Sequence, residues 1–179
     1  MFNGIIFNQG KVCNIKKNKN GINLFLKSNI KLNKNDIGIS VSCDGVCLTL
    51  ISIKKNILEF YLSFETITRS NFKKVKVGDK INLELPVKKN QRLSGHICQG
   101  HVDTTAKINK ILKKDKSLVF DFFIDKKFSK LLIEKASILI NGVSLTISNL
   151  RKKSFKIWVV PHTLKCTNLS NLKKGDLVN

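Results

Sequence analysis

The residues of this sequence best suited to chemistry lie in two matching turns and in one histidine-rich stretch. The turns read Asp-Gly-Val-Cys-Leu-Thr at residues 44–49 and Asn-Gly-Val-Ser-Leu-Thr at residues 141–146. They put the thiol of Cys47 and the hydroxyl of Ser144 at equivalent positions, so two similar pockets would differ chemically. In the stretch Ser-Gly-His-Ile-Cys-Gln-Gly-His-Val-Asp, His101 is a candidate acid–base group because imidazoles titrate near neutral pH. The alternative at each position is structural, as a small buried residue or a histidine at a domain junction.

The two turns belong to an internal duplication of the chain. Gly45 and Gly142 are 97 residues apart, and the same spacing relates other polar and small residues: Ser40 to Ser137, Thr66 to Thr163, Asn71 to Asn168, Gly78-Asp79 to Gly175-Asp176, and Asn82 to Asn179. Two copies with so long a period indicate a pair of small domains rather than a solenoid. A duplicated pocket suits a task that uses two similar ligands.

Short strand-like segments separated by turns position these residues. In the first half we expect strands at residues 5–15, 22–26, 39–43, 46–53, 57–64 and 80–85, with a helical turn within 65–72. In the second half we expect strands at residues 100–111, 117–124, 138–140, 143–148 and 155–160, with a short helix within 126–135. Short strands with turn signals every 8–12 residues are typical of small antiparallel barrels. The polar, basic segment 86–93 is the predicted linker.

Composition restricts the classes of protein to consider. Hydrophobic residues make up 42% of the 179 residues, which is enough for a core in each half. No apolar run approaches the length of a transmembrane helix, and the N-terminus has no signal-peptide pattern. The five cysteines include no C-x-x-C pair, so reduced thiols fit better than a disulfide framework or a zinc site.

The formal charge of +21 leaves two interpretations open. One is a nucleic-acid partner, which would need stacking aromatics on one barrel face with basic residues around them. The other is compositional drift, because the lysines fall in loops such as residues 16–20 with few arginines or aromatics among them. The aromatic residues at 120, 122 and 123 lie in an apolar strand-like run, which favours drift.

Taken together, these residues resemble the riboflavin synthase family. The matching positions are Met1-Phe2 with Gly4-Ile5, Gly45 with Cys47-Leu48-Thr49, Glu65-Thr66 with Asn71, Gly95-His96, Gly100-His101-Val102, Lys135, Gly142 with Ser144-Leu145-Thr146, and Pro161 with Thr163-Leu164. Each motif alone is weak, but the ordered set covers the whole chain and is specific.

The resemblance implies a fold, a reaction and an assembly. The fold is all-β, with two tandem six-stranded antiparallel Greek-key barrels related by duplication and a few short helices, here at residues 1–93 and 94–179. The reaction is the dismutation of two 6,7-dimethyl-8-ribityllumazine molecules to riboflavin and 5-amino-6-(D-ribitylamino)uracil, without cofactor or metal. The resemblance further implies a homotrimer and suggests an association with lumazine synthase; the reduced thiols indicate that the protein is cytoplasmic.

The resemblance also assigns residues to the substrate sites. It places one lumazine against the set Gly4, Ile5, Ile6, Cys47, Leu48, Thr49, Tyr61, Leu62, Ser63, Phe64, Glu65 and Thr66. It places the other against the set Gly100, His101, Val102, Ser144, Leu145, Thr146, Pro161, His162, Thr163, Leu164, Lys165 and Cys166, with Lys135 reaching across a subunit boundary. The catalytic candidates are His101, Cys47, Ser40 and Thr146.

Three departures from the family pattern bear on these expectations. His162 stands where the family commonly has Glu, and Cys166 stands where it has Arg, so the second pocket would hold its ribityl chain differently. The second half stops at the counterpart of Asn82, so we expect its last strand and the family's C-terminal helix to be missing and the trimer to be weakened. A non-catalytic lumazine- or flavin-binding protein of the same fold is the alternative function.

Overall fold

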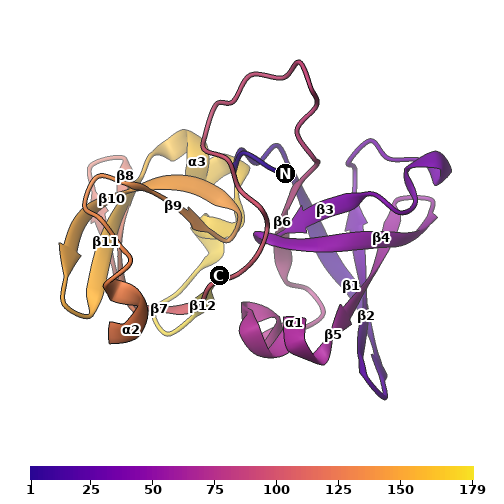
Figure 1. Ribbon diagram of the computed structural model, residues 1–179, viewed down its shortest axis with the longest axis horizontal. Coiled ribbons are helices and arrows are strands. Elements are labelled where there is room, and N and C mark those ends of the chain that lie inside the picture. Colours follow the sequence, from indigo (N-terminus) through magenta and orange to yellow (C-terminus); the bar gives the residue numbers. More distant parts are fainter.

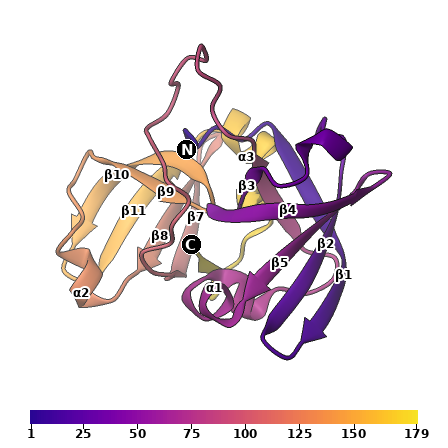
Figure 2. The ribbon, with the colours of Figure 1, turned by 45° about the vertical axis from the view of Figure 1, so that its right-hand side comes forward.

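The duplication in the sequence corresponds to two six-stranded antiparallel sheets, one built from each half of the chain (Figure 1). The computed structural model describes all residues, 1–179. The two units lie side by side, and the N-terminus lies between them in both views (Figures 1 and 2), while the linker arches away from the body as a long loop. No helix has the length and apolar character needed to cross a membrane.

The first unit is a closed barrel with the strand order β1-β2-β5-β4-β3-β6. Its strands are β1 (Asn8–Asn18), β2 (Gly21–Ser28), β3 (Ser40–Cys43), β4 (Val46–Lys54), β5 (Ile57–Ser63) and β6 (Lys80–Glu84). Its short helices are η1 (Lys34–Asp36), α1 (Phe64–Arg69) and η2 (Asn71–Lys74). The ring closes because β6 pairs with β1 on one side and, through Leu83 and Glu84, with β3 on the other.

The second unit repeats this order as β12-β7-β8-β11-β10-β9 but does not close. Its strands are β7 (Ala106–Lys114), β8 (Ser117–Phe123), β9 (Ser137–Ile140), β10 (Val143–Arg151), β11 (Ser154–Val159) and β12 (Leu177–Val178). Its helices are α2 (Lys126–Ser129), α3 (Pro161–Cys166) and η3 (Asn168–Asn171). β12 pairs with β7 only, so the expected second barrel is a half-barrel with a gap between its two edge strands, β12 and β9.

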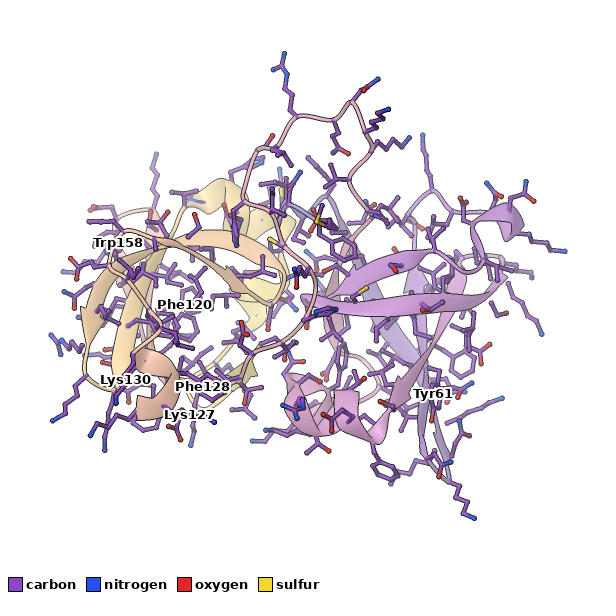
Figure 3. The ribbon with its side chains drawn as sticks, viewed as in Figure 1. Tyr61, Phe120, Lys127, Phe128, Lys130 and Trp158 are labelled. Carbon is purple, nitrogen blue, oxygen red and sulfur yellow. The ribbon has the colours of Figure 1, made fainter.

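Each unit has its own apolar core, because alternate strand residues face inward. Val12, Leu24 and Phe60 are completely buried in the first core. The second core contains a row of phenylalanines: Phe122 stacks on Phe120 with centroids 5.8 Å apart and on Phe155 at 5.1 Å. Phe120 points into the interior of the half-barrel in Figure 3. Phe120 and Phe122 are therefore packed in the core, as their apolar run predicted, but the third ring of that run, Phe123, is 50% exposed.

The two units are joined by a buried polar network with approximate two-fold symmetry. Asp44 Oδ1 accepts hydrogen bonds from the Asn82 backbone N–H at 2.8 Å and from the Asn168 side chain at 2.9 Å. Its counterpart Asn141 accepts equivalent bonds from the backbone N–H of Asn179 at 2.9 Å and from the side chain of Asn71 at 3.2 Å. The repeated asparagines of the sequence are therefore part of the junction between the units.

Two sequence-based element predictions were wrong. The expected strand at residues 5–15 begins only at Asn8, because the residues before it come from the half-barrel, where Gly4 accepts the Ser144 N–H and Ile6 is buried in the second core; Gly4 itself has φ +76°. Likewise, the expected strand at 100–111 begins at Ala106, and Gly100 has φ +84°. The residues before Asn8 and before Ala106 are therefore not part of a strand, and they cross between the two units.

Candidate functional site

Two segments cross from one unit to the other. We call residues 2–6 the first arm and residues 98–102 the second arm. The arms are paired with each other: the Phe2 N–H donates to the Cys98 carbonyl at 2.8 Å, and the Cys98 N–H donates to the Phe2 carbonyl at 2.9 Å. Beyond this bridge they separate. Each arm packs on the unit that belongs to the other half of the chain.

The second arm lies on the first barrel, against the turn that carries Cys47. The Cys47 N–H donates to the Gly100 carbonyl at 2.8 Å. A Cβ added at Gly100 would lie 2.7 Å from Cys47 Cβ, so only glycine permits this approach. Val102 packs against the first core, and His101 is exposed between these two contacts. The structure therefore places His101 directly after the residue that contacts Cys47, at the edge of the first unit.

The first arm makes the matching contacts on the half-barrel. The Ser144 N–H donates to the Gly4 carbonyl at 2.8 Å, and Ile6 is buried in the second core. A Cβ added at Gly4 would lie 2.7 Å from Ser144 Cβ. Because Cys47 and Ser144 occupy equivalent positions, the two arm contacts are copies of one arrangement.

This exchange regroups the residues expected at the two substrate sites. The sequence placed Gly4, Ile5 and Ile6 with Cys47, and Gly100 to Val102 with Ser144. The structure pairs them the other way, the first arm with Ser144 and the second arm with Cys47. The expectation failed because it assumed that each half of the chain folds onto itself.

The remaining predicted residues lie on the strands and helices expected for them. On the first barrel, Ser40 of β3 pairs with Thr49 of β4, and Thr66 of α1 receives its cap from Ser63, whose hydroxyl accepts the Thr66 N–H at 3.2 Å. The positions around them on β4, β5 and α1 are Leu48, Tyr61, Leu62, Phe64 and Glu65. Ser40, Cys47 and Thr49 thus come from two neighbouring strands of the first barrel, and the second arm packs beside them from the other half of the chain.

On the half-barrel, Thr146 of β10 pairs with Ser137 of β9. Leu145 adjoins Thr146 on β10, and α3 carries Pro161, His162, Thr163, Leu164, Lys165 and Cys166. Lys135 lies in an exposed loop at φ +70° beside β10, where its backbone N–H donates to the Ile147 carbonyl at 2.8 Å.

Helices α1 and α3 differ at the two family departures. In α1, Arg69 forms an ion pair with Glu65 one turn earlier. In α3, the equivalent residues are His162 and Cys166, whose Nε2 and Sγ atoms are 3.7 Å apart. The ionic pair of the first unit is therefore replaced by an imidazole–thiol contact in the second.

Sequence reasoning missed His96 as a partner of the second site. His96 Nδ1 lies 2.7 Å from Ser144 Oγ, and the His96 backbone N–H donates to the Asn3 carbonyl at 3.2 Å. Partial burial lowers the pKa of His96, which favours the neutral ring next to the Ser144 hydroxyl. The nearby Gly95-His96 motif was the available signal, but nothing in the sequence linked it to Ser144.

Two further residues also escaped prediction. Glu84, at the end of β6, accepts backbone hydrogen bonds from Asn3 at 2.8 Å and from Gly4 at 3.1 Å. Trp158 of β11 is the counterpart of Tyr61 of β5, and the two rings lie on opposite sides of the molecule in Figure 3. Trp158 is 51% exposed and Tyr61 is 42% exposed, so each unit presents one half-exposed aromatic ring.

A cavity of about 440 Å³ lies beside the open edge of the half-barrel. The second arm and His96 line one side of it, and β7 and β9 line the other through Ala106 and residues 138–140. Predicted site residues on β10 and α3 do not line this cavity. No group of three or more His, Cys, Asp or Glu side chains is arranged to hold a metal ion, and all five cysteines are free thiols.

The chain is similar to known proteins over its full length. A sequence model of the lumazine binding domain matches residues 3–86 and 99–179, once in each half. The chain is 34% identical to the riboflavin synthase of Actinobacillus pleuropneumoniae and 35% identical to that of Bacillus subtilis, in both cases over all of this chain and 83% of the relative. It is 33% identical to the riboflavin synthase of Escherichia coli, of which it covers 85%.

Solved structures resemble the whole arrangement of the two units. The crystal structure of LumP complexed with riboflavin matches with a TM-score of 0.89 and 25% identity, over all of this chain and 97% of that one. LumP complexed with 6,7-dimethyl-8-(1'-D-ribityl) lumazine matches with a TM-score of 0.86 and 26% identity, with the same coverage.

Proposed function

The chain belongs to the riboflavin synthase family of lumazine-binding transferases, and from this premise we propose that it converts two molecules of 6,7-dimethyl-8-ribityllumazine into riboflavin and 5-amino-6-(D-ribitylamino)uracil. A four-carbon unit passes from one molecule to the other, so one product gains the carbons that the other loses. The reaction is balanced without an added oxidant or reductant.

The observation that carries this proposal is the repeated contact between an arm and a turn. Gly100 on Cys47 and Gly4 on Ser144 create two copies of one arrangement within a single chain. A reaction that joins two identical molecules needs two sites of similar shape but different chemistry. The thiol of Cys47 and the hydroxyl of Ser144, bonded to His96, supply that difference.

We assign one lumazine to the first barrel and the other to the half-barrel, with the arms exchanged. On the first barrel, Ser40, Cys47 and Thr49 would face the ring together with His101 of the second arm. On the half-barrel, Ser144 and Thr146 would do so together with the first arm, and α3 would hold the ribityl chain. Holding two rings in contact supplies much of the rate in such a reaction, because it removes the entropy cost of their encounter.

In this scheme a proton leaves the ring methyl of one lumazine, and the resulting carbanion attacks the ring of the other. His101 is the proposed proton acceptor, because its exposed imidazole can reach a bound ligand without leaving the second arm. Cys47, whose backbone is fixed to Gly100, is proposed to assist at the acceptor ring. Thr146 and Ser40 are proposed to hold the rings by hydrogen bonds.

We further propose that the chain works as a homotrimer in which the first barrel of one subunit faces the half-barrel of another. This places the two lumazines at a subunit boundary, which Lys135 would cross from its exposed loop. The free thiols favour a reducing compartment, and we place the protein in the cytoplasm. An association with lumazine synthase would supply the substrate locally.

The direct test is to incubate the protein with 6,7-dimethyl-8-ribityllumazine and to follow riboflavin by absorbance and fluorescence. We expect riboflavin to form at half the rate at which lumazine disappears. Sedimentation at the same concentration measures whether active protein is trimeric. Tight binding without product would contradict the enzymatic proposal.

Binding without turnover is the second candidate function. It is favoured by one observation, the similarity to LumP structures that contain riboflavin and the lumazine. The two candidates separate in one titration, because a binding protein holds the lumazine unchanged over hours whereas the enzyme consumes it.

A further inference from the structure

The first arm is held from two sides by groups that belong to different units. Its carbonyl groups face the half-barrel and its linker: the Ser144 N–H donates to Gly4, and the His96 N–H donates to Asn3. Its amide groups face the first barrel. There the Asn3 N–H donates to Glu84 Oε1 at 2.8 Å, and the Gly4 N–H lies 3.1 Å from both oxygens of the same carboxylate.

Glu84 is one of two buried carboxylates of this chain; the other is Asp44, in the junction between the units. Only 8% of Glu84 is exposed, and it has no ion-pair partner, because the one salt bridge of the chain joins Arg69 to Glu65. Burying a carboxylate is unfavourable unless hydrogen bonds replace its hydration. Here those bonds come from the backbone of the first arm, so the arm and the carboxylate stabilise each other.

The contact between the first arm and Ser144 leaves little room for movement. A Cβ at Gly4 would lie 2.7 Å from Ser144 Cβ, and a Cβ at Gly95 would lie 2.0 Å from the Asn3 carbonyl oxygen. The Ser144 hydroxyl is in turn bonded to His96 at 2.7 Å. If the first arm moves where it contacts Glu84, Ser144 has to move with it, or the hydrogen bonds of Ser144 to Gly4 and His96 have to break.

We propose that Glu84 of the first barrel is a positioning residue for the substrate site of the half-barrel. Glu84 binds the backbone amides of Asn3 and Gly4, and in this way fixes the position of the Gly4 carbonyl that accepts the Ser144 N–H. Glu84 itself contacts no substrate in this arrangement. The inference rests on the proposed function, because it takes Ser144 as part of a lumazine site.

The test compares Glu84→Ala and Glu84→Gln with the unaltered protein and with a matched control, Glu59→Gln. Glu59 lies on β5 of the same barrel, and its carboxylate accepts one hydrogen bond, from the Asn23 side chain at 2.7 Å, away from the arm. Calorimetric titration with riboflavin, a product that the protein does not consume on its own, measures the two sites of each chain, and melting temperatures check the fold.

We expect Glu84→Ala to weaken one of the two sites by about tenfold or more and to leave the other within about twofold. Glu84→Gln should lie in between, because its amide oxygen can still accept one arm N–H. Equal weakening of both sites, or of neither, would overturn the proposal.

Hydrogen exchange at the Asn3 and Gly4 amides keeps the inference separate from the proposed function. Glu84→Ala should speed exchange at these two amides at least tenfold relative to Glu59→Gln, at matched stability. If the unaltered protein binds no lumazine, the proposed function fails and the exchange result still decides whether Glu84 holds the arm. Unchanged exchange at both amides would show that it does not.

Discussion

The first barrel and the half-barrel share a strand order and a set of arm contacts, but differ at the residues around them. Where the first barrel has Cys47 alone, the half-barrel has Ser144 with an imidazole partner. Where α1 has an ion pair, α3 has an imidazole–thiol contact. The strand order and the arm contacts are thus the same in the two units, whereas the side chains that would contact a ligand differ.

The junction between the units is more symmetric than the pockets, with one exception. Gly45 and Gly142 face each other there, and the added Cβ of either would lie within 3 Å of the other's backbone nitrogen. The buried asparagines pair across the junction in equivalent ways, but Asp44 carries a carboxyl group where Asn141 carries an amide. A shared junction requires matching shapes, whereas two sites for the two halves of one reaction require different chemistry.

Breaking the junction should have the largest effect. Gly45→Val adds a branched side chain at φ +81° and within 2.9 Å of the Gly142 nitrogen. We expect a loss of about 3 kcal/mol or more in the free energy of unfolding, because backbone strain adds to a clash that rigid backbone cannot relieve. Urea unfolding measures it.

Gly78→Val is the matched control for this clash. Gly78 has φ +99°, but an added Cβ there would meet no heavy atom within 4 Å. It should therefore show the backbone strain alone. Equal losses in the two variants would mean that the contact between Gly45 and Gly142 does not hold the units together.

The carboxyl group of Asp44 should make the stability of the junction depend on pH. Burial raises the pKa of Asp44 from 3.8 to about 7, so the folded protein binds this proton more tightly than the unfolded chain. The stabilising contribution is complete below the unfolded pKa and is lost as pH rises through about 7. Between pH 5.5 and pH 8 the wild-type protein should lose about 2 kcal/mol from this group.

Asp44→Asn should remove that pH dependence and make the junction symmetric, since Asn141 already occupies the equivalent position. Urea unfolding at pH 5.5 and pH 8 measures the change, and Asp115→Asn in an exposed turn is the control for loss of charge. The same pH dependence in Asp44→Asn and wild type would show that another group is responsible.

Cys47→Ser makes the first site resemble the second and tests whether their difference matters. We expect the rate of riboflavin formation to fall by roughly a hundredfold, the lower end of the usual range for loss of one acid–base group. Stability should hardly change, because Cys47 is only partly buried. Steady-state rates measure the effect, and Cys13→Ser, at an exposed position of β1, is the control. Full activity in Cys47→Ser would remove Cys47 from the mechanism.

The smallest effect on stability should come from the helix pairs. Glu65 and Arg69 have side chains 71% and 67% exposed, so Glu65→Gln should cost at most about 0.5 kcal/mol. The double change His162→Glu with Cys166→Arg would build the same pair in α3, with an equally small gain. If the lumazine affinity of the second site nevertheless rises several-fold, α3 contacts the ligand; an unchanged affinity would contradict that placement.

The sequence predicted the features that local patterns encode. Asp44-Gly45 and Asn141-Gly142 gave both hairpins, because the left-handed turn conformation favours Asn, Asp and Gly. Alternating apolar residues predicted most strands, and the constant spacing of 97 residues indicated the duplication. The same spacing identified Cys47 and Ser144 as equivalent positions with different side chains.

What the sequence by itself determined is therefore the type, order and duplication of the elements. Only the tertiary structure showed that the arms are exchanged, that Ser144 meets His96, and that Glu84 holds Asn3 and Gly4. The reason is physical: residue periodicity records which face of a strand is buried, but the arms are held by backbone amides and carbonyls that every residue carries. In the sequence, Glu84 between two leucines resembles an exposed strand residue. Its role depends on a segment 80 residues away that folding places beside it.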